Sequence, residues 1–309
     1  MSSLPPDAVP PRNRTLRGVL WMVLAMSCIG IVDALAKYLG ARLHGVQVAW
    51  GYFFAMWIGV MLLASALPRR VLPAGMPIWR TRHLWLQMLR ALCLVGSLSL
   101  LFSALRVMPL AEATVISFTS PLFVVALAGP ILHESVGWRR WLAVLSGLGG
   151  ALLVIRPGSE LFVWAALLPL FGAVFFAAFT IITRLVSDPP ATTLFYTSGV
   201  GAMALTLGLP FTWLTPNSSE TGLYAAAGCV GLVAHLGIVR AMQHADASVV
   251  APINYVRLVW AISIGIVVFG DWPHTLELVG GAIIVVSGLY VVYGAARSDR
   301  AVATTSGSG

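Results

Sequence analysis

Charged residues are scarce in this sequence. Of its 309 residues only 10% are Asp, Glu, Lys or Arg, whereas 59% are hydrophobic and the mean hydropathy is +0.89. Soluble domains carry about a quarter charged residues, so the composition excludes a soluble protein. The relevant structural unit is therefore a membrane span of about 20 apolar residues.

Residue types and motifs that mark particular chemistries are also missing. Only one of the 19 basic residues is a lysine, and the arginines are scattered between apolar runs, which argues against nucleic-acid binding. The three cysteines have neither pairing nor metal-ligand spacing. No GxSxG, HExxH or P-loop sequence occurs. We therefore expect no enzyme, no ATP-driven pump formed by this chain alone, no metal and no cofactor.

What the sequence has instead is long apolar runs, separated by charges and Pro/Gly clusters. In lipid each backbone N–H and C=O must be bonded within its segment, which favours helices. The runs are longer and more continuous than the ~10-residue alternating strands of a membrane barrel. The sequence predicts an all-α integral membrane protein with ten transmembrane helices at 18–39, 47–66, 83–105, 109–131, 138–156, 162–184, 192–213, 221–242, 247–269 and 275–294.

The basic residues between these runs predict the orientation, because cytoplasmic loops are enriched in Lys and Arg. Thirteen fall on one side: Arg12, Arg14, Arg17, Arg69, Arg70, Arg80, Arg82, Arg139, Arg140, Arg184, Arg240, Arg297 and Arg300. Four fall on the other: Lys37, Arg42, Arg106 and Arg156. We expect a multi-pass protein of the inner (cytoplasmic) membrane with both termini cytoplasmic.

Two internal alignments indicate a duplicated chain. A shift of 137 residues places Phe118 on Tyr255, and a shift of 147 places Lys37 on Arg184. The predicted units are a cytoplasmic tail (1–16), two five-helix repeats (17–158 and 159–297) and a flexible tail (298–309). Since five is odd, the second repeat enters the membrane from the opposite side, as in secondary transporters built around a midplane site.

Two long motifs resemble a known family. The stretch ALRVMPLAEATVISFTSPLFVVALAGPILHE (104–134), and RAMQHADASVVAPINYVRLVWAISIGIVVFGDWPHTLELVGGAIIVVSGLYVV (240–292) in the second half, are similar to the drug/metabolite transporter superfamily, EamA-type branch. The resemblance implies a ten-helix inverted-repeat carrier that moves small metabolites, often outward. It also implies a central cavity lined by helices 1–4 and 6–9. Many relatives carry an arginine in the second helix, where this chain has GYFFAMW (51–57).

Arg257 is the most prominent candidate for the site, because a charge at the bilayer centre costs ~2.5–3.5 kcal/mol on insertion scales. It lies near the middle of the run 247–269 and shares a helix face with Asn254. Pro252, one turn below, removes a backbone donor and can open the helix. We interpret Arg257 as an anchor for an anionic group of the substrate, with a structural ion pair as the alternative.

Three further charges accompany it. Asp33 and Lys37 are four residues apart on the first helix, where they could form a local pair. Asp33 could instead pair with Arg257 or carry a coupling proton, and Lys37 could extend toward the interface. Glu112 opens the fourth helix, where an acid also suits the helix dipole.

The remaining candidates are polar or aromatic groups inside predicted spans. Arg90 could contact substrate or extend to the cytoplasmic interface. His235 is either a substrate contact or a satisfied core residue, and Ser120 is the counterpart of Arg257 under the 137-residue shift. The predicted substrate-binding set is Arg257, Asn254, Tyr255, Ser117, Ser120, Arg90, His235 and Trp260, with Asp33, Lys37 and Glu112 for coupling or charge pairing.

These candidates favour a secondary carrier that exports a small polar metabolite, such as an amino acid or similar zwitterion, by alternating access. A multidrug exporter is an alternative, although it predicts an acidic cavity and the interior has more fixed positive groups. A membrane-embedded lipid enzyme would need a nucleophile or a set of metal ligands. A channel would need a continuous polar helix face. The expected partners are the small molecule and the lipid bilayer, with protons as an alternative driving ion. The sequence assigns no oligomeric state.

Overall fold

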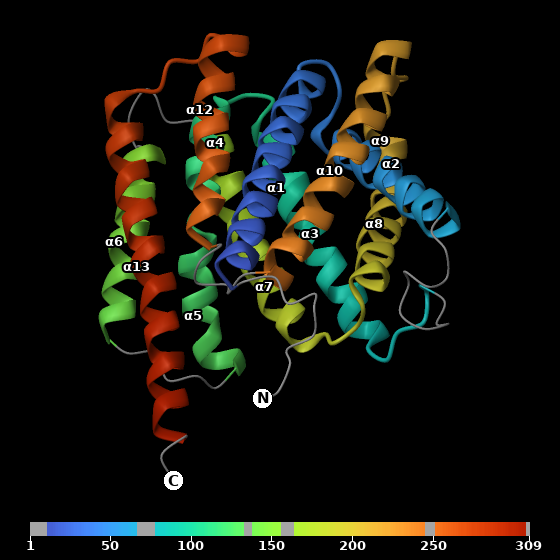
Figure 1. Ribbon diagram of the computed structural model, residues 1–309. Coiled ribbons are helices and arrows are strands. Elements are labelled where there is room, and N and C mark those ends of the chain that lie inside the picture. Colours follow the sequence, from blue (N-terminus) through green and yellow to red (C-terminus); the bar gives the residue numbers. More distant parts are fainter. Residues whose placement is uncertain (1–10, 67–77, 133–137, 156–163, 245–250, 307–309) are drawn as a thin grey trace.

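The computed structural model describes residues 11–66, 78–132, 138–155, 164–244 and 251–306, and within these ranges the regular structure is entirely helical (Figure 1). This confirms the all-α prediction. The α-helices are α1 (Pro11–Gly40), α2 (Gly45–Ala66), α3 (Leu84–Ala104), α4 (Leu110–Ser117), α5 (Ser120–Leu132), α6 (Trp138–Ile155), α7 (Leu167–Leu185), α8 (Pro190–Thr206), α9 (Leu209–Thr212), α10 (Ser218–His244), α12 (Val256–Phe269) and α13 (Thr275–Ser306). Two 3₁₀ segments, η1 (Trp164–Ala166) and η2 (Ala251–Tyr255), precede α7 and α12.

Many of these helices are suited to cross a membrane. Six stretches in the described ranges are long and apolar enough, at 16–40, 45–65, 84–104, 110–127, 164–183 and 218–244. Three shorter apolar helices lie at 141–155, 253–269 and 275–290. These findings agree with a multi-pass membrane protein, while the count of ten spans stays a prediction.

Three predicted spans are not continuous helices. The run 109–131 is divided into α4 and α5 at Phe118–Thr119, just before Pro121, which has no N–H to continue the ladder. The Thr119 hydroxyl instead donates to the Ile116 carbonyl at 2.7 Å. In the run 247–269, residues 251–255 form the 3₁₀ segment η2 and only 256–269 are α-helical. The run 192–213 is interrupted at residues 207–208, between α8 and α9.

The helices from the two predicted repeats pack against one another in a reciprocal pattern. The helices are numbered here by predicted span. Helix 1 packs on helix 8 (α1 with α10), and helix 6 packs on helix 3 (α7 with α3). Likewise helix 2 packs on helix 8 (α2 with α10), and helix 7 packs on helix 3 (α8 with α3). Helix 2 also contacts its equivalent, helix 7 (α2 with α8), and helix 5 contacts its equivalent, helix 10 (α6 with α13). If each helix of one repeat is exchanged for the equivalent helix of the other repeat, five positions away in the order, the same set of pairs results. Figure 1 shows α6 and α13 side by side at one edge of the bundle.

The α6–α13 contact depends on glycine. A Cβ at Gly150 would lie 2.8 Å from the Gly280 carbonyl oxygen, and one at Gly280 would lie 2.6 Å from the Gly150 carbonyl oxygen. Such close approach of two backbones is typical of packed membrane helices. By contrast, a Cβ at the neighbouring Gly149 would meet nothing within 4 Å.

This contact gives a matched pair of substitutions. We expect Gly150→Ala to destabilise the protein by about 1–3 kcal/mol, the usual range for overpacking, because a backbone atom must move. Gly149→Ala should be neutral or slightly stabilising, since alanine favours a helix by ~1 kcal/mol over glycine. Thermal unfolding in detergent measures both, and equal melting temperatures for the two variants would contradict the contact.

Candidate functional site

The centre of the site is an ion pair between α1 and α12. Arg257 lies one residue after the start of α12, and its Nε donates to Oδ2 of Asp33 at 2.6 Å. The Asp33 side chain is 3% exposed and that of Arg257 is 18% exposed. In the part of the chain that the structure describes, the two terminal guanidinium nitrogens make no hydrogen bond. One edge of the guanidinium is therefore fixed, and the other is available to a ligand.

Trp260 orients α12 against α1. Its Nε1 donates to the Ser27 hydroxyl at 2.8 Å. Its Cβ stands 2.7 Å from the place that a Cβ on Gly30 would occupy, so this approach requires glycine. The predicted ligand contact Trp260 thus has a packing role at the helix pair that carries Arg257.

The two helix breaks face each other beside this ion pair. Phe118, at the α4–α5 break, contacts Tyr255, at the end of η2, with ring centroids 4.9 Å apart. The 137-residue alignment pairs these same two residues. Ser120 is buried at the start of α5, and half-buried Asn254 lies next to Tyr255 in η2. Ser117 donates to the Ala113 carbonyl at 2.9 Å, so its hydroxyl proton is already used within α4.

A second polar contact joins α2 and α10. The Tyr52 hydroxyl lies 3.3 Å from Nε2 of His235. Tyr52 also lies within electrostatic range of both Asp33 and Arg257. A Cβ at Gly231 would lie 2.4 Å from the Tyr52 ring, which explains why the ring can approach α10. His235 therefore belongs to the surroundings of the Asp33–Arg257 pair.

At one end of the bundle, which we call the Lys37 end, the two repeats are tied by ion pairs. Lys37 Nζ lies 2.7 Å from Oδ2 of Asp271 and donates to the Met108 carbonyl at 2.9 Å. Arg42 pairs with Glu220 of α10. Lys37 is one turn from Asp33, so α1 carries an acid and then a base, each paired with a group of the second repeat.

At the opposite end, which we call the Asp188 end, the contacts are hydrogen bonds between charged and neutral polar groups. Arg90 on α3 is only 2% exposed, and it donates from Nε to Oε1 of Gln87 at 3.3 Å and from a terminal nitrogen to the Thr193 carbonyl at 3.0 Å. It also bonds the Thr197 hydroxyl and lies 5.1 Å from the centroid of the Phe179 ring. These partners place Arg90 in a contact between α3, α7 and α8.

Asp188, in the loop between α7 and α8, completes this contact. It accepts from the Gln87 amide at 2.9 Å and from the Thr81 hydroxyl. Burial raises the pKa of Asp188, but hydrogen bonds from Thr81, Gln87 and the Arg82 backbone outweigh burial and hold that pKa below its usual value. Gln87 thus connects the Arg90 guanidinium to the Asp188 carboxylate.

This pKa predicts a pH effect on stability. Because the folded-state pKa is depressed, Asp188 contributes stability that is present above its unfolded pKa of about 3.9 and is lost as pH falls through the lower folded value. We expect the melting temperature of the wild type to fall more steeply below pH 4 than that of Asp188→Asn. Parallel melting curves from pH 6 to pH 3 would contradict the assigned hydrogen bonds.

The structure distributes the predicted site residues over three places. The elements around the central ion pair carry most of them, namely Asp33, Arg257, Tyr255, Asn254, Ser117, Ser120, Trp260 and His235. Lys37 lies at its own end with Asp271, and Arg90 lies at the Asp188 end. Glu112 is half-buried in the first turn of α4.

Sequence reasoning missed several partners in these contacts. Tyr52 lies in the apolar stretch GYFFAMW (51–57), where nothing in the sequence marks it as a polar contact. Gln87 shares a helix face with Arg90 in the sequence pattern, but its partner Asp188 lies near a helix end, where polar residues are ordinary. A signal was nevertheless present, since Asp188 is an acid in a loop that the topology places beside basic loops.

Comparisons with known proteins identify the family of this chain. The model of the EamA-like transporter family matches the chain twice, at residues 16–156 and 163–294. An S-adenosylmethionine uptake transporter of Rickettsia prowazekii is 30% identical over 92% of this chain and 95% of its own length. A riboflavin transporter of Rhizobium johnstonii is 28% identical over 95% of this chain and 96% of its own.

Two other similarities extend the comparison. The pseudopaline exporter CntI of Pseudomonas aeruginosa is 29% identical over 87% of this chain and 94% of its own length. A solved crystal structure superposes with a TM-score of 0.61 at 20% identity, covering 93% of this chain and 98% of the other. At that identity the superposition supports the fold alone.

Proposed function

The chain belongs to the EamA-like transporter family, and on that premise we propose that it is a secondary transporter of the inner membrane that exports a small polar metabolite by alternating access. The resemblance noted in its sequence is thereby confirmed, and the relatives are named as transporters rather than enzymes. The proposed substrate is an amino acid or similar zwitterion.

Arg257 carries the substrate proposal. A guanidinium inside a span is retained at a considerable energetic cost, and Asp33 engages only its Nε. The terminal nitrogens present the fork geometry that binds a carboxylate or phosphate through two hydrogen bonds. Tyr52 and His235 lie nearby as groups able to donate or accept hydrogen bonds to the rest of a polar molecule.

The proposed architecture is ten spans in two inverted repeats, 17–158 and 159–297, with both termini cytoplasmic. The double family match and the reciprocal helix packing support this division. The helix breaks at Phe118 and Tyr255 also support it, since discontinuous helices often border midplane sites in transporters. The Lys37 end would then be external and the Asp188 end cytoplasmic.

Contacts between the repeats at both ends support alternating access. Lys37–Asp271 and Arg42–Glu220 join the repeats at one end, and Gln87–Asp188 joins them at the other. We propose that these contacts open in turn as the repeats rock about the central ion pair. Each group would then exchange its partner for water, at the end that is open.

The test is transport by purified protein in proteoliposomes. The panel is S-adenosylmethionine, riboflavin and pseudopaline, the compounds named for the relatives, together with the amino acids. Since relatives are named for uptake and for export, export is tested by comparing metabolites inside and outside cells with and without the protein. If no panel compound moves in liposomes and no metabolite changes in cells, the proposal is wrong.

A further inference from the structure

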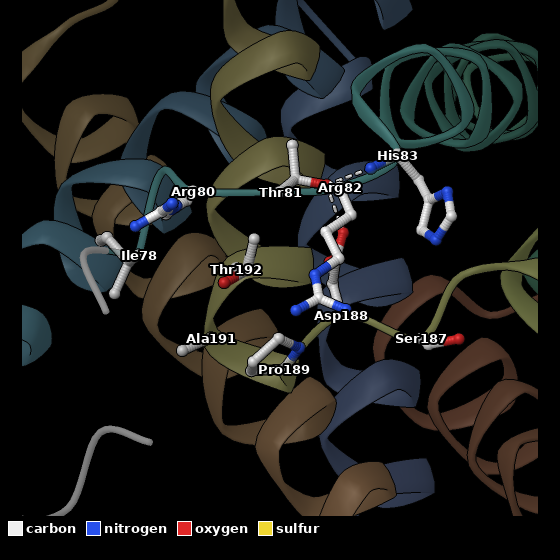
Figure 2. A pocket seen from close by; sticks show the side chains of 10 residues that line it. All are labelled: Ile78, Arg80, Thr81, Arg82, His83, Ser187, Asp188, Pro189, Ala191 and Thr192. Atoms are coloured by element: carbon white, nitrogen blue, oxygen red, sulfur yellow. Dashed lines mark hydrogen bonds between the residues drawn. The ribbon is translucent and has the colours of Figure 1, made fainter. Parts of the chain in front are cut away.

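A cavity of about 610 Å³ lies at the Asp188 end, between one loop from each repeat. Residues 78–83 form one side and residues 187–192 the other (Figure 2). In that view, Arg80 and Arg82 lie on either side of Thr192. The lining therefore includes two guanidinium groups and the Thr192 hydroxyl.

No ion pair joins these two arginines to Asp188, the acid in the lining, among the residues that the structure describes. The Asp188 carboxylate accepts from the Thr81 hydroxyl, the Gln87 amide and the Arg82 backbone. Among the residues that the structure describes, neither the Arg80 nor the Arg82 guanidinium has an ion-pair or hydrogen-bond partner. Both side chains are exposed, so they can receive an anion from outside the fold.

Apolar side chains next to the arginines indicate that this loop lies at the membrane surface. Trp79 is 63% exposed and Trp85 is 72% exposed, and Leu84 between them is also exposed. Tryptophans are enriched where lipid headgroups meet the acyl chains. A ligand held by the arginines would therefore have apolar surface directly beside it.

In the cavity at the Lys37 end, by contrast, the basic residues have partners within the protein. It measures about 500 Å³ and contains Lys37 and Arg106. There Lys37 is paired with Asp271, and Arg106 donates to the Gly40 carbonyl at 3.2 Å. Its cations are thus already engaged within the protein, whereas those of the cavity at the Asp188 end are not.

We infer that the cavity at the Asp188 end binds the phosphate of an anionic phospholipid, held by Arg80 and Arg82, with the acyl chains along Leu84 and Trp85. Basic pockets between membrane helices on the cytoplasmic side are suited to such headgroups. Since the lining comes from both repeats, the lipid would bridge the two loops. The inference depends on the membrane placement and not on the identity of the transported substrate.

The experiment compares two double variants in nanodiscs. Arg80→Gln/Arg82→Gln removes the proposed ligands, and Arg17→Gln/Arg240→Gln removes two exposed charges from the same predicted side of the membrane. Phosphatidylglycerol is titrated into phosphatidylcholine discs, and bound lipid is counted by native mass spectrometry while the melting temperature is recorded. Inorganic phosphate is added to pure phosphatidylcholine discs in a separate arm.

We expect phosphatidylglycerol to bind and stabilise the wild type and the Arg17/Arg240 control alike. The Arg80/Arg82 variant should melt normally in phosphatidylcholine but bind phosphatidylglycerol about 25-fold more weakly, since each of the two basic groups contributes about a fivefold factor. Equal losses in both variants would overturn the inference, because general charge would then explain binding. Stabilisation by inorganic phosphate without any by phosphatidylglycerol would also overturn it.

Discussion

Replacing Arg257 by alanine is expected to reduce transport by at least about 100-fold. Two charge-assisted hydrogen bonds to a substrate anion, each worth about 1.5–3 kcal/mol, would be lost. The measurement is initial uptake in proteoliposomes of the substrate that the wild type transports. Arg257→Lys should recover only part of the activity, because an ammonium cannot hold Asp33 and a bidentate ligand in the same fork geometry.

Stability must be separated from function in this experiment. Arg257→Ala leaves the buried Asp33 carboxylate unpaired, and breaking a buried pair in this way costs about 3–5 kcal/mol. Asp33→Asn/Arg257→Gln removes both charges and should restore the melting temperature while transport stays low. Near-normal transport by this double variant would show that the pair serves only the fold.

The second large effect is expected from Asp33→Asn. The amide oxygen can still accept from Arg257 Nε, so Arg257 should remain approximately in place. We expect kcat/KM to fall about tenfold, because a guanidinium without its carboxylate is held less firmly. This predicts that Asp33 is a positioning residue, in contrast to the alternative in which it carries a coupling proton.

A pH gradient across the liposomes distinguishes these two roles. If Asp33 only positions Arg257, the gradient should affect wild type and Asp33→Asn by the same factor. If Asp33 carries the proton, the gradient response should disappear in the variant while exchange without a gradient continues. A gradient response present in the wild type and absent in Asp33→Asn would contradict the positioning role.

The sequence allowed the central pair to be predicted, because charges inside apolar runs are rare and must find partners. Asp33 and Arg257 both stand out for this reason, and their contact is one of three alternatives that the sequence offers for Asp33, beside a local pair with Lys37 and a coupling proton. The breaks near Pro121 and Pro252 were also foreseeable, because proline removes a backbone donor. The interruption between α8 and α9, at Leu207–Gly208, has the same local cause, because Pro210 lies at the second position of α9.

The other contacts between the repeats could not be predicted from the sequence. Tyr52 and His235 are 183 positions apart, and Gln87 and Asp188 are 101 apart. Each is an ordinary residue of its own helix or loop, and only the packing of one repeat on the other gives it a partner. Arg90 illustrates this, since a buried arginine was expected to face either substrate or lipid interface, and it bonds the polar groups of α3 and α8 instead.

The two ion pairs of α1 restrict how the repeats can move. Asp33 and Lys37 are about 6 Å apart along the axis, and they pair with Arg257 and Asp271 respectively. Sliding α1 along its axis by one turn would break both pairs at once and leave the buried Asp33 carboxylate unpaired, which is costly. Tilting one end of α1 away would break one pair and keep the other. We therefore expect the two pairs to favour rocking of α1 over its translation.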